Sequence, residues 1–463
     1  MSIHSILRIL LITHTLLINT SFAQISDDQI SQIELLVERT FDNDLPGGVI
    51  LVAHQEQVLF QSAIGVSETD GPPLSMDSIF RIASVTKQFT AVAILQLAEQ
   101  GKIDLDDEIT KYIPEFDTKG DYISIEMLLN HTSGIRSYTS MPAFNPELES
   151  TDVTPEQIMD FFNNQELLFK PGTLHSYSNS GYALLGIVIE RVSKQTYAKY
   201  MQTNIFAKAD MQRAFAGNDH KDTTGFVTGH RRIRSGFEPT DYISLTWPYA
   251  AGCIETTVVD LHKWMRALFS GKLITPESLD RAHTITTLPN GREMKYGYGW
   301  DILEVQGRPS VEHGGGIAGF VSHVLYIPSE EIFVAILCNA QHRGIEDLSA
   351  RFAAIALGEP YNDLGATDLD TSDLSEFVGT YTDHNGNERQ ITVIDNRLFS
   401  QRVGGMGLYL IAKSKDRFTL EGQLIEIEFE RDELDQVIAL MFKTRSRDIH
   451  WARNPKPQSK TAP

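Results

Sequence analysis

Apolar and polar residues follow two different patterns, one before and one after residue 360 or so of the chain. In the earlier part, apolar residues recur at helical spacing or form short β-prone runs. We expect helices at 27–41, 90–99, 180–192, 258–269 and 345–357, and strands at 49–53, 58–62, 320–327 and 332–338. Segment 90–99 is apolar nearly all round, which predicts a buried helix. Strands at both ends with helices between them predict one α+β domain whose sheet is completed late in the chain.

The later part consists of short runs in which apolar and polar residues alternate, separated by Asn, Asp and Gly. Residues 425–430 alternate strictly, as a half-solvated strand requires. Runs of this kind predict a small antiparallel sheet or barrel. We therefore expect a larger domain over 24–360, an acidic linker over 361–373, a small all-β domain over 374–453 and a disordered tail over 454–463.

The first 23 residues have the pattern of an export signal. Residues 9–18 are mostly apolar but too few to span a bilayer, and Arg8 precedes them. Ser21 and Ala23 are small residues at the positions that a signal peptidase reads. We expect cleavage before Gln24 and a periplasmic or secreted protein without stable membrane insertion. A buried N-terminal helix or an uncleaved anchor is the alternative, because a single Arg is a weak positive region.

Composition narrows the possible partners. The 463 residues contain 40 Lys+Arg and 61 Asp+Glu, a formal net charge of −21, which argues against nucleic acid and anionic membrane surfaces as partners. Two cysteines, Cys253 and Cys338, exclude a disulfide-rich scaffold and a Cys-based zinc site. Each lies in an apolar run, which favours two buried thiols over a bridge.

Ser84 and Lys87 stand just before the apolar segment 90–99. Residues three apart lie on one face of a helix, so the hydroxyl and the amine would be neighbours. A serine needs a base to act as a nucleophile near pH 7, and a lysine serves only if burial or a nearby cation lowers its pKa. The alternative is a solvated Ser and Lys in the first turn of a helix.

Two further segments carry groups suited to the same chemistry. Tyr177 and Asn179 follow a Pro-Gly turn and lead into the segment 180–192. A tyrosine can act as a proton shuttle, and it can act as a phenolate if adjacent lysine charge lowers its pKa. His313 precedes three glycines, which would let a ligand approach the backbone closely. Taken singly, each segment also fits a hydrogen-bonded loop tyrosine or a flexible turn.

Together, Ser84–Lys87, Tyr177–Asn179 and His313–Gly315 resemble the three motifs of the serine β-lactamase/penicillin-binding-protein superfamily. The resemblance is to its class C-like branch of β-lactamases, D-amino-acid peptidases and esterases, and covers residues 30–358 or so. Flanking segments 128–134, 171–173 and 296–300 look equally familiar. The resemblance implies an antiparallel sheet flanked by helices. Residues 377–381 resemble part of the lipocalin-like β domain often appended to these hydrolases.

The resemblance implies that Ser84 is the acylated nucleophile. Lys87 would accept its proton, or would hold Tyr177 as a phenolate that does so. Tyr177 would then protonate the leaving group and activate the water that removes the acyl group. The backbone N–H groups of Ser84 and of Gly316 would form the oxyanion hole.

The remaining motif residues would bind substrate. Asn179 would bind the acyl-side amide, while His313 and Gly315 would line the site, with the histidine helping to dock the leaving group. His131, within segment 128–134, is expected to tie its loop together, and His175 to be a loop residue. No step requires a metal or a cofactor.

The third motif departs from the K-T-G form, because His-Gly-Gly supplies a titratable ring and no hydroxyl. An esterase or a peptidase acting on D-amino-acid peptides is therefore favoured over a strong β-lactamase. We expect an exported serine hydrolase that cleaves a small-molecule ester, amide or peptide through an acyl-enzyme. The alternatives are a penicillin-type sensor that acylates without turnover and a structural protein on a hydrolase scaffold.

Overall fold

The computed structural model describes residues 25–218, 224–234, 236–342, 344–361, 374–405 and 407–455. The expected signal 1–23, nearly all of the expected linker and residues 456–463 of the expected tail lie outside these ranges. No helix in the described ranges is long and apolar enough to cross a membrane.

The larger part of the molecule is built on an antiparallel sheet of six described strands, in the order β10-β11-β12-β13-β1-β2. Their bounds are β10 Asp301–Val305, β11 Arg308–Ile317, β12 Phe320–Ile327, β13 Ile332–Cys338, β1 Gly48–His54 and β2 Gln57–Ile64. β1 pairs with β13 from Gly48↔Cys338 to His54↔Ile332, so the N-terminal hairpin completes a sheet whose other strands come late in the chain. This confirms the expected α+β arrangement.

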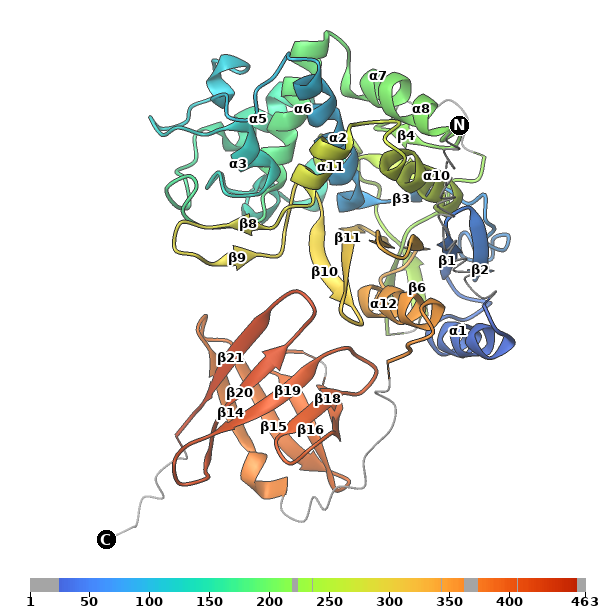
Figure 1. Ribbon diagram of the computed structural model, residues 1–463, viewed down its shortest axis with the longest axis vertical. Coiled ribbons are helices and arrows are strands. Elements are labelled where there is room, and N and C mark those ends of the chain that lie inside the picture. Colours follow the sequence, from blue (N-terminus) through green and yellow to red (C-terminus); the bar gives the residue numbers. More distant parts are fainter. Residues whose placement is uncertain are drawn as a thin grey trace, which may run out of the picture.

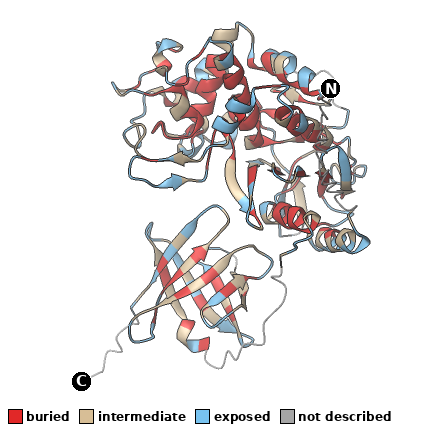
Figure 2. Cartoon of the chain, in the orientation of Figure 1, coloured by how far each residue is buried: buried red, intermediate tan, exposed pale blue. Residues whose placement is uncertain are grey.

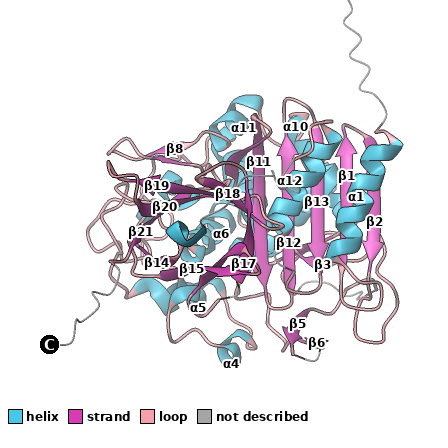
Figure 3. Cartoon of the chain, turned by 90° about the horizontal axis from the view of Figure 1, so that it is seen from below, coloured by secondary structure: helices cyan, strands magenta, loops and turns pink. Residues whose placement is uncertain are grey.

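The sheet separates two apolar cores (Figure 3). Val49 and Leu51 of β1 face the larger core, and Ile50 and Val52 face the smaller one, which explains why β1 is apolar throughout. Helices α1 and α12 pack over the smaller core. The two cysteines are free and buried, as expected.

Helices α2 and α6 form the centre of the larger core (Figures 1 and 2). Helix α2 begins at Thr86, four residues earlier than expected, because the 3₁₀ turn Ala83–Val85 leads straight into it. Lys87 is therefore part of the buried helix. The helices are α1 Asp27–Thr40, α2 Thr86–Glu99, α3 Ile125–Leu129, α4 Pro146–Glu149, α5 Pro155–Asn163, α6 Asn179–Ser193, α7 Tyr197–Met201, α8 Ala207–Ala209, α9 Tyr249–Gly252, α10 Val258–Phe269, α11 Pro276–Ala282 and α12 Ile345–Ala356. Short strands are β3 Phe80–Arg81, β4 Phe215–Ala216, β5 His230–Ile233, β6 Gly236–Pro239, β7 Ile254–Thr256, β8 Thr286–Thr287 and β9 Glu293–Met294.

The C-terminal part is a closed barrel in which each strand pairs with the next along the chain (Figure 1). Its strands are β14 Gly379–Asp383, β15 Glu388–Ile394, β16 Arg397–Arg402, β17 Gly407–Ala412, β18 Arg417–Leu420, β19 Glu426–Arg431, β20 Val437–Lys443 and β21 Asp448–Arg453. Pairing of β14 with β21, as at Tyr381↔Arg453, closes the ladder and removes its free edges. The expected small all-β unit is thus a closed barrel.

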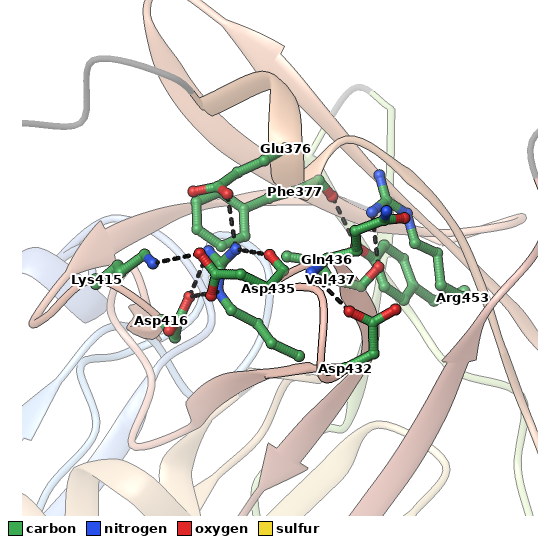
Figure 4. A network of polar contacts seen from close by, with 11 residues as sticks. Glu376, Phe377, Lys415, Asp416, Asp432, Asp435, Gln436, Val437 and Arg453 are labelled. Carbon is green, nitrogen blue, oxygen red and sulfur yellow. Dashed lines mark hydrogen bonds and ion pairs between the residues drawn. The ribbon is translucent and has the colours of Figure 1, made fainter.

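One end of the barrel is held by a polar network (Figure 4). Arg431 contacts the carboxylates of Glu376 at 2.8 Å, Asp416 at 2.7 Å and Asp435 at 3.7 Å. Arg453 donates to the backbone carbonyls of Val437 and Val378. The charged groups at this end are therefore neutralised or hydrogen-bonded within the barrel itself.

Candidate active site

Ser84 lies in a tight 3₁₀ turn directly before α2. Ala83 has a φ of +46°, a conformation that L-residues adopt at a cost, and the surrounding structure must therefore hold this turn in place. Strand β11 lies against the turn at Gly315, where an added Cβ would be 2.3 Å from the Ile82 carbonyl oxygen. The glycine therefore brings β11 next to the nucleophile's turn, and Ser84 and Gly316 line the same cavities.

Lys87 is fully buried and directed at Ser84. Its Nζ lies 3.1 Å from Ser84 Oγ, 2.8 Å from Asn179 Oδ1 and 2.8 Å from the Ala251 carbonyl oxygen. Burial lowers the pKa of Lys87 well below its ordinary value, and no carboxylate among the described residues forms an ion pair with it. A neutral amine can donate two N–H bonds, to Asn179 and Ala251, and then presents its lone pair to the Ser84 hydroxyl. The geometry thus suits a lysine that takes the serine proton.

Tyr177 lies beside this pair. Lys87 Nζ is 4.7 Å from the centre of the Tyr177 ring. Tyr177 is 39% exposed, but desolvation on its packed side raises its pKa above the ordinary value, and a hydrogen bond with Ser84 offsets this only in part. This direction favours a neutral phenol at rest, and the expected phenolate option stays an untested alternative. The neutral phenol is a proton donor, and of the two bases left open by the sequence, the structure favours Lys87.

Asn179 is the first residue of α6, with its side chain between Lys87 and a polar loop. Its amide nitrogen Nδ2 donates to Thr139 Oγ1 at 3.0 Å, and its backbone N–H donates to Ser137 Oγ at 3.1 Å. These bonds fix the amide orientation so that its oxygen faces Lys87. The structure shows Asn179 holding the lysine, and its expected contact with substrate stays a prediction.

His313 is buried at the end of a hydrogen-bonded chain. Ser178 N–H donates to His131 Nδ1 at 3.2 Å, Tyr296 OH lies 3.3 Å from His131 Nε2 and 3.0 Å from His313 Nε2, and His313 Nδ1 lies 2.6 Å from the Gly314 carbonyl oxygen. A single set of neutral tautomers satisfies every bond: His131 Nε2–H donates to Tyr296, whose hydroxyl donates to His313. Burial, and then the charge of Lys87, lowers the pKa of His313 to about 3. The ring expected to be titratable is thus held neutral through the physiological range.

Ser84 lies where two cavities meet. The first, of about 1080 Å³, runs from Ser84, Tyr177 and His313 to the inner wall of the barrel. The second, of about 470 Å³, adjoins Ser84 and Asn179 and has aromatic walls. Its large apolar lining residues are Tyr138, Phe144, Ile243, Trp247 and Ile317. An acyl group and a leaving group could therefore occupy separate spaces on the two sides of the nucleophile.

The barrel contributes a buried charge to the larger part. Arg445, from the loop between β20 and β21, donates to both carboxylate oxygens of Glu312 at 2.7 and 2.9 Å. Glu312 is 1% exposed, and its carboxylate also contacts His323 Nε2 at 3.3 Å. Burial alone would raise the pKa of Glu312, but Arg445 and His323 lower it to about 2. The barrel therefore supplies the counter-charge for a carboxylate on β11, next to the third motif.

Sequence reasoning missed three parts of this site. Tyr296 lies in the familiar segment 296–300, and no role was expected for it, although its hydroxyl joins two histidines. No local sequence pattern marks Thr139 or the pair Glu312 and Arg445, because their partners are far away in the chain. His131 was expected to tie its own loop together, and its ring instead joins that loop to Ser178 and Tyr296. No group of three His, Cys, Asp or Glu in the described ranges could hold a metal.

The fold together with a serine, a buried lysine and a phenol at one cavity junction defines a serine hydrolase of the β-lactamase type. A family profile described as Beta-lactamase matches residues 33–358. "Penicillin-binding protein 4*" of Bacillus subtilis is 29% identical over 425 residues, covering 86% of this chain and 93% of that protein. "D-aminopeptidase" of Gluconobacter oxydans is 28% identical over 342 residues, covering 73% of this chain and 63% of that protein.

A solved structure extends the likeness to the barrel. The octameric penicillin-binding protein homologue from Pyrococcus abyssi superposes with a TM-score of 0.64 at 23% identity, covering 92% of this chain and 99% of that one. The chain belongs to the Beta-lactamase family, as its motifs led us to expect, and is related to penicillin-binding proteins and D-aminopeptidases.

Proposed function

We propose that the protein hydrolyses esters or amides, including those of D-amino acids, through an acyl-enzyme on Ser84. The observation that carries the proposal is the 3.1 Å contact of Ser84 Oγ with a buried Lys87 that has no counter-ion among the described residues, at the junction of two cavities. The name of the D-aminopeptidase relative supports the D-amino-acid class.

The acylation step follows from the positions of the protons. Lys87 Nζ takes the Ser84 proton as Oγ attacks the carbonyl carbon, and the negative oxygen is bound by the N–H groups of Ser84 and Gly316. Tyr177 gives its proton to the leaving nitrogen or oxygen, and the Lys87 ammonium returns one to Tyr177. Water then attacks the acyl carbon and gives a proton to Lys87. The bond between the acyl carbon and Ser84 Oγ breaks, Oγ takes that proton from Lys87, and the acid is released.

The two cavities divide the substrate. The aromatic cavity beside Asn179 suits an apolar acyl group, while the larger cavity past His313 suits the leaving group. The neutral imidazole of His313 offers no fixed cation for the carboxylate of a β-lactam, so β-lactam hydrolysis is expected to be slow. We also propose that residues 1–23 are a cleaved signal, because their short apolar run is followed by Ser21 and Ala23, and that the protein is periplasmic or secreted.

A substrate panel tests the proposal. Purified wild-type protein is assayed on a p-nitrophenyl ester, D- and L-phenylalanine amide, a D-Ala-D-Ala peptide and a fluorescent penicillin, with Ser84→Ala as the inactive control. We expect ester and D-amide turnover that Ser84→Ala abolishes while its circular dichroism stays unchanged. Equal activity in Ser84→Ala would overturn the proposal. A penicillin label that forms on Ser84 and never leaves, with no turnover of the other substrates, would establish the sensor alternative.

A further inference from the structure

The barrel wall of the large cavity carries two arginines that face each other. Arg389 on β15 and Arg402 on β16 are direct cross-strand partners, and both line the cavity that also reaches Ser84 and Tyr177. Like charges placed directly opposite on adjacent strands repel and lower stability. An arrangement of this kind needs a compensating negative group.

Neither arginine has that compensation within the barrel. Arg389 Nη1 donates to Ser400 Oγ at 2.7 Å, and Arg402 Nη2 donates to Asn387 Oδ1 at 2.6 Å. No carboxylate of the described residues forms an ion pair with either one. By contrast, Arg431 at the other end of the barrel contacts the carboxylates of Glu376, Asp416 and Asp435, which Figure 4 labels. Arg445 is neutralised by Glu312.

The surroundings of Arg389 supply further unused donors. Its guanidinium carbon lies 4.3 Å from the centre of the Phe442 ring and 5.1 Å from that of Trp451, which fixes the plane of the group. Arg389 Nε and Trp451 Nε1 are both buried without a hydrogen-bond acceptor. Buried donors that lack partners are costly, so the cavity wall that Arg389 and Trp451 line is short of acceptors. Burial, and then Arg402, lowers the pKa of Arg389 to about 10, so it remains charged at neutral pH.

We propose that Arg389 and Arg402 form an anion subsite that binds a carboxylate of the substrate, on the leaving-group side and remote from the scissile bond. The cavity of about 1080 Å³ is large enough for a leaving group that extends from Ser84 to the barrel. A planar guanidinium forms paired hydrogen bonds with a carboxylate, which gives orientation as well as affinity. That the bound carboxylate belongs to a substrate rests on the proposed hydrolysis at Ser84. That the two arginines bind an anion does not depend on that hydrolysis.

A matched pair of ligands tests the subsite. Two phenyl esters of one acid differ only in a flexible chain on the phenol, which ends in a carboxylate in one and in a primary amide in the other. Binding is measured calorimetrically on full-length Ser84→Ala protein, where turnover is absent. We expect the carboxylate ester to bind about 10-fold more tightly than the amide, which is the scale of one added charge-assisted hydrogen-bond pair, and the preference to shrink with salt.

The variants separate this site from a structural role. In the Ser84→Ala background, Arg389→Gln should abolish the preference, Arg402→Gln should reduce it, and neither should change the affinity for the amide. Arg397→Gln is the matched control. Arg397 lies on β16, as Arg402 does, but it is ion-paired with Glu421 and does not line the cavity. Because Arg389 and Arg402 repel each other when no ligand is bound, we also expect Arg389→Gln to keep or raise the melting temperature.

Each outcome decides one proposal. A preference that survives Arg389→Gln, or an absent preference in the parent protein, overturns the subsite. A large fall in melting temperature for Arg389→Gln together with no preference in the parent identifies a purely structural arginine. If the parent shows the preference but wild-type protein cleaves neither ester, the subsite stands and the hydrolase proposal fails.

Discussion

The two walls of the large cavity differ in how their polar groups are satisfied. On the Ser84 side, Lys87, Asn179 and His313 each have hydrogen-bond partners within the larger part of the molecule. At the barrel wall, Arg389 and Trp451 keep donors without acceptors. The comparison teaches that the first wall is organised before any ligand arrives, as a reaction site must be, while the second is completed by a ligand.

The largest expected effect comes from removing the base at the organised wall. Lys87→Met keeps the volume of the side chain but removes the lone pair that faces Ser84, so kcat/KM for ester hydrolysis should fall on the order of 10³-fold or more. Steady-state assays of wild type and variant measure this. Thermal unfolding is the control and should show a folded protein, because methionine suits a fully buried position. Retention of more than a tenth of the activity would contradict Lys87 as the base.

The next effect concerns the contact that joins the two walls. Arg445→Met leaves Glu312 buried without its counter-charge and should cost about 3–5 kcal/mol in the free energy of unfolding of the larger part. Arg447→Met, in the same loop but exposed, should change it by less than about 0.5 kcal/mol. Urea unfolding followed by tryptophan fluorescence measures both. The double variant Glu312→Gln/Arg445→Met should recover much of the loss, and no recovery would mean that the pair is not the cause.

Acid should destabilise the larger part through buried histidines before it affects the Glu312 pair. Burial lowers the pKa of His283 and of His313 to about 3, so both are neutral when folded but take up a proton below about pH 6.5 when unfolded. The unfolded state then binds more protons, so stability is complete above pH 6.5 and is lost as the pH falls toward 3. The Glu312 carboxylate, with a pKa of about 2, loses its contribution only below its ordinary pKa near 4.5.

Melting temperature against pH measures this order. Between pH 7 and pH 5.5 the two histidines should together cost about 2–3 kcal/mol of unfolding free energy. His313→Asn should flatten part of that slope. Because the raised pKa values of Glu255 and Asp301 act in the opposite direction over this range, the deciding quantity is the difference between wild type and His313→Asn. Equal slopes in the two proteins would show that the His313 ring is not held neutral.

The smallest expected effect concerns the hydroxyl between the two histidines. Tyr296→Phe keeps the packing but leaves His313 Nε2 without its donor, so the imidazole loses its fixed orientation. We expect kcat to fall about 5-fold with little change in KM, since one hydrogen bond contributes about 1 kcal/mol. Tyr298→Phe, in the same segment but bonded to Glu126 and Arg281, serves as control. Equal kcat in Tyr296→Phe and wild type would remove this residue from the positioning of His313.

Local spacing predicted some of this molecule well. The three-residue separation of Ser84 and Lys87 was enough to bring their side chains together, and helical periodicity located α1, α10 and α12 to within a residue or so at each end. The alternation of residues 425–430 predicted a strand, which the structure has as β19. These features depend on neighbours in the sequence, so a single chain reveals them.

The rest depends on register and on distant contacts. Nothing in the residues around Arg389 and Arg402 shows that they face each other, because this follows from the pairing of β15 with β16. The lowered pKa of Lys87 requires full burial, and the raised pKa of Tyr177 requires the desolvation that its distant neighbours impose. The contact of Arg445 with Glu312 spans 133 positions and depends on how the barrel meets β11.

The most direct test of the central claim is the mass of the intact protein during turnover of a slowly hydrolysed ester. The account predicts that wild-type protein gains the mass of one acyl group, that peptide mapping places it on Ser84, and that the adduct decays with time. Ser84→Ala should show no added mass. A stable adduct on another residue, or turnover without an adduct on Ser84 in rapidly quenched samples, would contradict the account.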